Sequence, residues 1–162
     1  MDTAPHASAI EVHDLAQGVT AKIVPGHPCR ASVDGIDMQV GGEPMVAQVG
    51  TTRWTGDDRG NGITLLKDGD AVARIVEDDG GIALIDPQGV AFVRVAHDAI
   101  IDRQNAVVRH VVATAKGIDV QPGPSVTGTE DRLLAAVLTA VEAPPEVRAM
   151  AACHRLFALE KK

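Results

Sequence analysis

Aromatic side chains are almost absent from this sequence of 162 residues. They account for 2% of the chain, as Trp54, Phe92 and Phe157, and there is no tyrosine. Surfaces that bind single-stranded nucleic acid stack the bases on several aromatic rings. The sequence lacks the rings for such a surface. Its 45% of hydrophobic residues have to build a core mainly from Val, Ile, Leu, Ala and Met.

Positive charge is scarce as well. The chain carries 15 Lys and Arg against 22 Asp and Glu, which gives a formal net charge of −7 at pH 7. Such a charge repels nucleic acid and anionic membranes through its long-range field. We therefore expect no nucleic-acid partner.

Long apolar runs and cysteines are also few. No stretch approaches the roughly 20 apolar residues that a transmembrane helix needs. Residues 1–8 (MDTAPHAS) show no signal-peptide pattern and are expected to be a flexible N-terminus. Cys29 and Cys153 can form one bridge but no disulfide framework. We expect a soluble cytoplasmic protein with reduced thiols.

Short β-branched runs, separated by turn residues such as Asp34-Gly35 and Asp68-Gly69, fill most of the chain. Strands of about 4–8 residues with such turns are typical of an antiparallel meander. We predict one mainly β domain over residues 9–162, a barrel or a sandwich. The predicted strands are residues 9–12, 19–24, 30–33, 36–40, 45–49, 63–66, 71–76, 81–85, 90–96 and 106–113.

Two helices are predicted near the C-terminus, over about residues 128–143 and 146–160. Thr127 and Glu130 have the spacing of a capping box, and the following LLAAVLTAV (133–141) carries no charge. A helix that is apolar nearly all round is buried, either inside the β-structure or in an oligomer interface. Pro144 and Pro145 end it. The second helix places one stripe of apolar residues on its surface: Val147, Met150, Cys153, Leu156 and Phe157.

The order of these elements resembles that of a known group of proteins. ITLLKDGDAVARI (63–75) and IALIDPQGVAFVRV (82–95) each consist of an apolar strand, an Asp/Gly turn and a second apolar strand. Followed by LLAAVLTAV (133–141) as a central helix, they make the chain resemble the tubby-like barrels, which include phospholipid scramblases and LURP-one-related proteins. The resemblance covers about residues 9–143. It implies a barrel of twelve strands around a helix, and lipid or protein binding rather than catalysis.

The stretch RWTGDDRGNGIT (53–64) holds the only tryptophan and two adjacent aspartates. As a calcium loop it would place the cation Arg59 where a ligand oxygen belongs, and as a phosphate loop it lacks the lysine. We interpret it as a polar connection between strands. Trp54 is then a core anchor or a contact at the rim.

Several acidic turns are expected to share one end of the meander, because alternate turns of an up-and-down sheet lie at the same end. Oxygen ligands gathered there can hold Ca²⁺ or engage a basic partner, although aspartate is also a common turn residue. The carboxylates so gathered are Asp57, Asp58, Glu77, Asp78, Asp79, Asp98 and Asp102. The candidate binding residues are Trp54, Asp57, Asp58, Asp78, Asp79 and Phe157, with the four aspartates also as metal candidates.

Histidine and cysteine occur together in His27-Pro28-Cys29 and in Cys153-His154. Two of each are enough for zinc, but neither pair has the usual ligand spacing. A Cys–His nucleophile would require the partners to meet across the fold. We expect Cys153 to be a small buried residue of the helix stripe.

Three functions follow from these patterns. The leading hypothesis is a non-catalytic binding module for a lipid or protein partner. The second is a structural or regulatory homo-oligomer assembled through helix 146–160. The third is an enzyme that uses His27 or Cys29. The sequence contains neither the serine elbow of hydrolases nor a dinucleotide-binding fingerprint.

Overall fold

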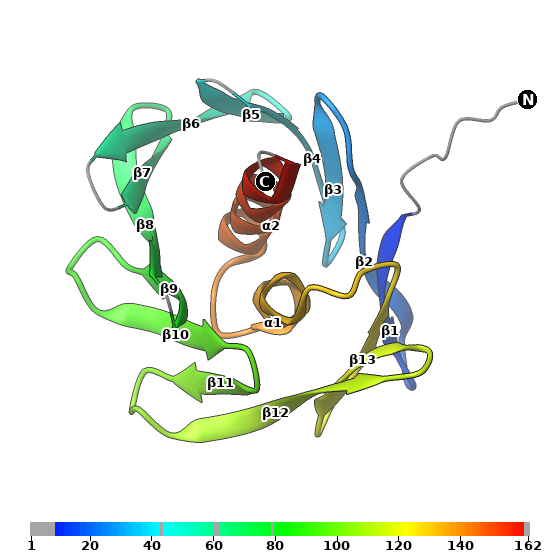
Figure 1. Ribbon diagram of the computed structural model, residues 1–162. Coiled ribbons are helices and arrows are strands. Elements are labelled where there is room, and N and C mark those ends of the chain that lie inside the picture. Colours follow the sequence, from blue (N-terminus) through cyan, green and yellow to red (C-terminus); the bar gives the residue numbers. More distant parts are fainter. Residues whose placement is uncertain (1–8, 43, 60–61, 79, 161–162) are drawn as a thin grey trace, which may run out of the picture.

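The chain forms a closed antiparallel β-barrel around two helices, as Figure 1 shows in a view along the barrel axis. The computed structural model describes residues 9–42, 44–59, 62–78 and 80–160. Within them, each strand pairs with its neighbours in the chain, and β1 pairs with β14 to close the ring. The predicted fold class, mainly β with two C-terminal helices, is confirmed.

The elements follow one another as fourteen strands and then two helices. The strands are β1 (Ile10–Asp14), β2 (Gly18–Val24), β3 (Cys29–Val33), β4 (Ile36–Gly41), β5 (Met45–Val49), β6 (Thr52–Arg59), β7 (Gly62–Lys67), β8 (Asp70–Asp78), β9 (Gly81–Ile85), β10 (Ala91–Ala96), β11 (Ala99–Asp102), β12 (Val107–Thr114), β13 (Gly117–Gln121) and β14 (Ser125–Thr127). The helices are α1 (Arg132–Thr139) and α2 (Pro145–Glu160).

Every predicted strand overlaps an observed one, and four observed strands were not predicted: β6, β11, β13 and β14. Strand β6 corrects our interpretation of RWTGDDRGNGIT as a connection. Its residues from Thr52 to Arg59 pair with β5 on one side and β7 on the other. The backbone makes these bonds whatever the side chains are, and Trp54, which is 4% exposed, anchors the strand in the core.

Tight turns fix the register of the first hairpins. Asp34 and Gly35 have φ values of 49° and 84°, and Asp68 and Gly69 have 49° and 90°. Two consecutive residues with positive φ give the two-residue turn whose twist matches that of paired strands, and an Asp-Gly sequence favours it. The predicted turns are therefore present at both places.

Aspartates cap several other turns with their side chains. Asp86 is the clearest case, because its carboxylate accepts the backbone N–H groups of Val90 at 3.0 Å and Gln88 at 2.9 Å and pairs with Arg103 at 2.6 Å. The hydrogen bond from Val90 is the main cause of a lowered pKa of Asp86, and those from Gln88 and Arg103 act in the same direction. The carboxylate of such a residue stabilises its turn.

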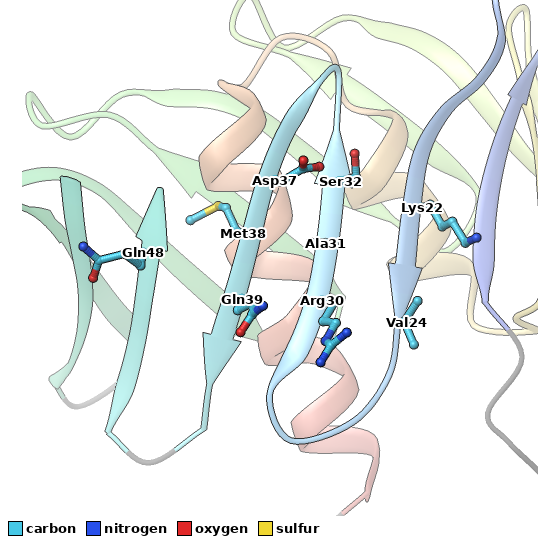
Figure 2. Close-up of a pocket in the computed structure, with 9 residues that line it drawn as sticks. All are labelled: Lys22, Val24, Arg30, Ala31, Ser32, Asp37, Met38, Gln39 and Gln48. Carbon is cyan, nitrogen blue, oxygen red and sulfur yellow. The ribbon is translucent and has the colours of Figure 1, made fainter. Parts of the chain in front are cut away.

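Alternate side chains of each strand point into the barrel. Along β3, for example, Cys29, Ala31 and Val33 are buried, whereas Arg30 is exposed. Figure 2 looks at this part of the wall from outside, with the helices behind the strands. Eight strands enclose a space that side chains alone can fill, and fourteen enclose a wider one. The two helices occupy it.

Helix α1 is buried on all sides after its first residue, Arg132, as the charge-free run predicts: every residue from Leu133 to Thr139 is at most 3% exposed. Its start differs from the predicted capping box. The N-cap is Asp131, whose Oδ1 accepts the N–H of Leu134 at 3.1 Å, while Thr127 belongs to β14. The chain from Thr127 to Asp131 is needed to cross from the wall to the barrel interior.

Helix α2 is buried as well, which changes the interpretation of its apolar stripe. Val147, Met150 and Phe157 are 2%, 0% and 9% exposed. Small residues such as Ala149 and Ala152 are also buried on other sides of the helix. The stripe packs inside the barrel, so it offers no surface for the oligomer expected from helix 146–160. No helix in the described ranges is long and apolar enough to cross a membrane.

Arg148 ties α2 to the end of the barrel where this helix begins. The residue is 3% exposed, and its guanidinium donates to the carbonyl of Ala143 at 3.0 Å, to that of Leu138 at 3.2 Å and to Asp34 Oδ2 at 2.6 Å. A buried arginine is stable only when its donors are satisfied. These bonds connect α2 with the end of α1 and with the β3–β4 turn.

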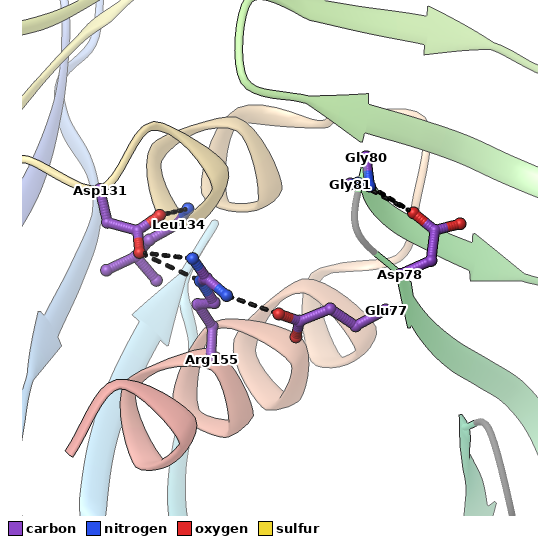
Figure 3. A network of polar contacts seen from close by, with 7 residues as sticks. All are labelled: Glu77, Asp78, Gly80, Gly81, Asp131, Leu134 and Arg155. Carbon is purple, nitrogen blue, oxygen red and sulfur yellow. Dashed lines mark hydrogen bonds and ion pairs between the residues drawn. The ribbon is translucent and has the colours of Figure 1, made fainter. Parts of the chain in front are cut away.

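Arg155 does the same near the other end of α2, as Figure 3 shows. Its Nε donates to Asp131 Oδ2 at 3.0 Å, and its Nη1 pairs with Glu77 at the end of β8. The carboxylate of Asp131 therefore has two tasks, capping α1 and binding α2. Glu77, one of the predicted rim carboxylates, is used inside the fold.

A disulfide joins Cys29 of β3 to Cys153 of α2, with their Cα atoms 5.9 Å apart. Both residues are fully buried. The expectation of reduced thiols is therefore wrong for this structure, although Cys153 is buried as predicted. The bridge spans 124 residues of sequence and fixes the helix to the wall.

We predict that Cys153→Ala lowers the free energy of unfolding by about 2–5 kcal/mol, because the bridge restricts the unfolded chain over a long loop. Urea unfolding measures the loss. As a control, dithiothreitol should destabilise the wild-type protein and leave Cys29→Ala/Cys153→Ala unchanged. Equal sensitivity of both proteins would contradict the prediction.

A second prediction concerns Asp131. We expect Asp131→Ala to cost about 3 kcal/mol, because it leaves Arg155 with one carboxylate and removes the helix cap. Asp131→Asn keeps a good cap and should cost about 1 kcal/mol less. The exposed Asp37→Ala is the control, expected within about 0.5 kcal/mol of wild type. Thermal and urea unfolding of the three variants check the order.

Candidate functional site

The largest cavity near candidate residues lies at the end of the barrel where α2 finishes, which we call the α2 end. It has a volume of about 920 Å³ and lies between the last turns of α2 and the wall that runs from β4 to β7. Ligand sites commonly have volumes of about 300–1,000 Å³. The cavity is lined by His27, Gly42, Pro44, Met45, Gly56, Asp57, Asp58, Ile63, His154, Phe157, Ala158 and Glu160.

Three of the predicted binding residues meet in this cavity: Asp57, Asp58 and Phe157. Asp58 is opposite Ile63 in the β6–β7 pair, so both residues belong to the same face of the sheet. Trp54 is not part of the lining. Its ring is buried four residues from Asp58 along the same face of β6, and Lys67 Nζ lies 5.9 Å from the ring centroid. Of the two alternatives for Trp54, the core anchor is confirmed.

The remaining acidic residues do not join them. Asp78 Oδ1 accepts the N–H groups of Gly80 at 2.8 Å and Gly81 at 3.0 Å, which caps the β8–β9 turn in Figure 3. Asp102 caps the β11–β12 turn, which is at the opposite end of the barrel because β11 separates it from Asp98. Asp79 lies outside the described residues.

The predicted gathering of seven carboxylates at one end is therefore wrong. Glu77 is paired with Arg155, and Asp102 is at the other end. Among the residues that the structure describes, no three His, Cys, Asp or Glu side chains are grouped so that they could hold a metal ion. The described residues give no support to a calcium site at Asp57, Asp58 and Asp78.

Two histidines that are far apart in the sequence, His27 and His154, line the same cavity. The disulfide between Cys29 and Cys153 places the turn with His27 beside the helix turn with His154. His27 Nε2 lies 3.0 Å from Glu160 Oε2, and the His27 ring stacks on Phe157 with ring centroids 5.3 Å apart. In the sequence, His27 lies two residues before Cys29, and His154 directly follows Cys153. This proximity indicates that the two histidines lie close together only once the two cysteines are known to be bonded to each other.

The chemistry available to the Cys–His pairs is limited by the same bond. Each sulfur is bonded to the other, so neither is a thiolate that could attack a substrate or bind zinc. What remains in the cavity is two carboxylates, from Asp58 and Glu160, and two imidazoles above an apolar surface, because Asp57 alternates with Asp58 along β6 and belongs to the outer face with its partner Thr64. This combination suits a cation on an apolar stem, the form of a lysine or arginine side chain.

At Gly56, the absence of a side chain leaves the space that the apolar residues of the cavity wall occupy. A Cβ atom added at Gly56 would lie 2.9 Å from Met45 Cβ and 3.1 Å from Ile63 Cγ2, so a side chain there would displace the apolar residues of the wall. At Gly42, on the other side, the nearest atoms would be 4.0 Å away, from His27 and Phe157. The wall therefore requires glycine at residue 56 and tolerates a small side chain at residue 42.

A second hollow, of about 550 Å³, lies on the outer wall over β2–β5 and is drawn in Figure 2. A row of cross-strand neighbours runs through it: Arg30 faces Val24 and Gln39, and Gln39 faces Gln48. Its charges are mixed, with Lys22 and Arg30 against Asp37, and none of the predicted binding residues reaches it. The cavity at the α2 end is the better candidate.

Comparison with known proteins adds no relative. No protein-family model matches the sequence, and neither a curated protein nor a solved structure matches it. The resemblance to tubby-like barrels stays a prediction, and the fourteen strands and two enclosed helices differ from the twelve and one that it implies. The function has to be argued from the cavity.

We predict opposite outcomes for the two glycines of the cavity. Gly56→Ala should lower the free energy of unfolding by about 1–3 kcal/mol, because the new methyl group overlaps Met45. Gly42→Ala should stay within about 0.5 kcal/mol of wild type. Urea unfolding of both variants is the measurement. A tolerated Gly56→Ala would show that the wall yields without cost.

Proposed function

We propose that the protein is a non-catalytic binding module that holds a basic segment of a protein partner in the cavity at the α2 end. The observation that carries this proposal is the convergence of Asp58 and Glu160 around the apolar surface of Met45, Ile63 and Phe157. The carboxylates attract a cationic group, and the apolar residues accommodate its stem.

The same charges favour a protein over a lipid as the partner. A net charge of −7 and a cavity with two carboxylates repel the anionic headgroups to which many lipid-binding proteins attach through basic residues. Burial of Val147 and Phe157 inside the barrel also removes the surface that an oligomer through α2 would use. A partner with Lys or Arg in an exposed, extended segment fits the site best.

Two features of the cysteines support a binding role and bear on location. Their bond leaves no thiolate for catalysis by a Cys–His pair. Disulfides persist mainly in oxidising compartments. The cytoplasmic location expected from the sequence stays untested, and we propose an oxidising compartment in its place.

The test uses an octapeptide of alternating arginine and valine, acetylated and amidated, with a peptide containing citrulline in place of arginine as the neutral isostere. We expect isothermal titration calorimetry at pH 8.0 to show binding of the arginine peptide alone. Asp58→Asn should weaken it about fivefold, from a loss of about 1 kcal/mol of electrostatic attraction.

The matched control is Asp70→Asn, which changes the net charge equally but lies in the β7–β8 hairpin at the opposite end of the barrel. Its affinity for the peptide should stay within about twofold of wild type, because exposed charges that far apart are screened by salt. Equal losses in Asp58→Asn and Asp70→Asn would mean that the peptide binds through overall charge, and the proposal would fail.

A further inference from the structure

Two imidazoles line the cavity together with its carboxylates, and their position is fixed by the fold. His27 comes from the β2–β3 turn and His154 from α2, and the disulfide holds these two segments together. The other histidines in the described part of the chain, His13, His97 and His110, do not line it. A site for a cation thus contains two groups that can themselves become cations.

The acidic groups that share the cavity with these rings come from a strand on one side and from a helix on the other. Asp58 comes from β6, and Glu160 comes from the last turn of α2. With both imidazoles neutral, these described side chains give the cavity a charge of about −2, and with both protonated about zero. A bound cation then loses most of the attraction that holds it.

His27 also competes directly for one of the carboxylates. Its Nε2 is 3.0 Å from Glu160 Oε2, and stacking on Phe157 keeps the ring in this place. Protonation turns this hydrogen bond into an ion pair, which is stronger because both partners are charged. Glu160 is then engaged by the protein itself and is less available to a ligand.

We infer that His27 and His154 make this cavity pH-dependent, so that it holds a cationic ligand at neutral pH and releases it on acidification. The inference rests on the proposed function. Histidine side chains titrate near about pH 6.5 and carboxylates near about pH 4. Lowering the pH from 8.0 to 5.5 therefore covers the range in which imidazoles in general gain a proton and carboxylic acids in general stay ionised.

The experiment measures the same arginine–valine peptide by calorimetry at pH 8.0 and 5.5, with circular dichroism to establish that the protein is folded at both. Wild type should bind about tenfold more weakly at pH 5.5, because each of the two protonated imidazoles repels the cationic peptide. His27→Gln/His154→Gln, which cannot acquire these charges, should change less than about twofold. His110→Gln, an exposed histidine of β12, should behave like wild type.

The outcomes separate the two proposals. Absence of peptide binding at pH 8.0 would overturn the proposed function, and the pH dependence with it. Binding at pH 8.0 with the same tenfold loss in the double variant would overturn only the role of the histidines. Loss of the pH dependence in the double variant and its retention in His110→Gln would support both.

Discussion

The rest of the structure depends on the need to fill a wide barrel. Fourteen strands enclose more space than the inward side chains of a sheet can occupy, and an empty interior would lose the packing that stabilises a core. Two helices from the end of the chain supply the missing volume. This explains why α1 carries no charge after Arg132 and why α2, with Arg148 and Arg155 inside the barrel, needs carboxylates at both of its ends.

The candidate site is a product of that packing. Helix α2 ends at Glu160 beside the β2–β3 turn, and the space left between its last turns and the wall is the cavity. The disulfide between β3 and α2 brings two histidines to the cavity: His27, near Cys29, and His154, next to Cys153. A bond that serves stability therefore also determines which ionisable groups face the ligand.

The sequence predicted what depends on local chemistry. Short β-branched runs and the turn residues between them identified ten strands, and the charge-free run 133–141 identified a buried helix. Strand β6 was missed because its polar residues read as a loop, although pairing on both sides makes it a strand. Asp57, Asp58 and Phe157 were predicted as binding residues, but their meeting with His27 and His154 depends on cysteines 124 residues apart. Distances of that kind are set by tertiary structure and leave no local signal.

The position of the two helices at the end of the sequence has a consequence for synthesis. A ribosome delivers all fourteen strands before residues 132–160, so the wall is made before the core that it surrounds. Closure between β1 and β14 around an unfilled interior would exclude the helices, whose residues form a large part of the buried core. The nascent strands therefore have to stay open until residues 132–160 emerge, a period in which unpaired strand edges are exposed to aggregation.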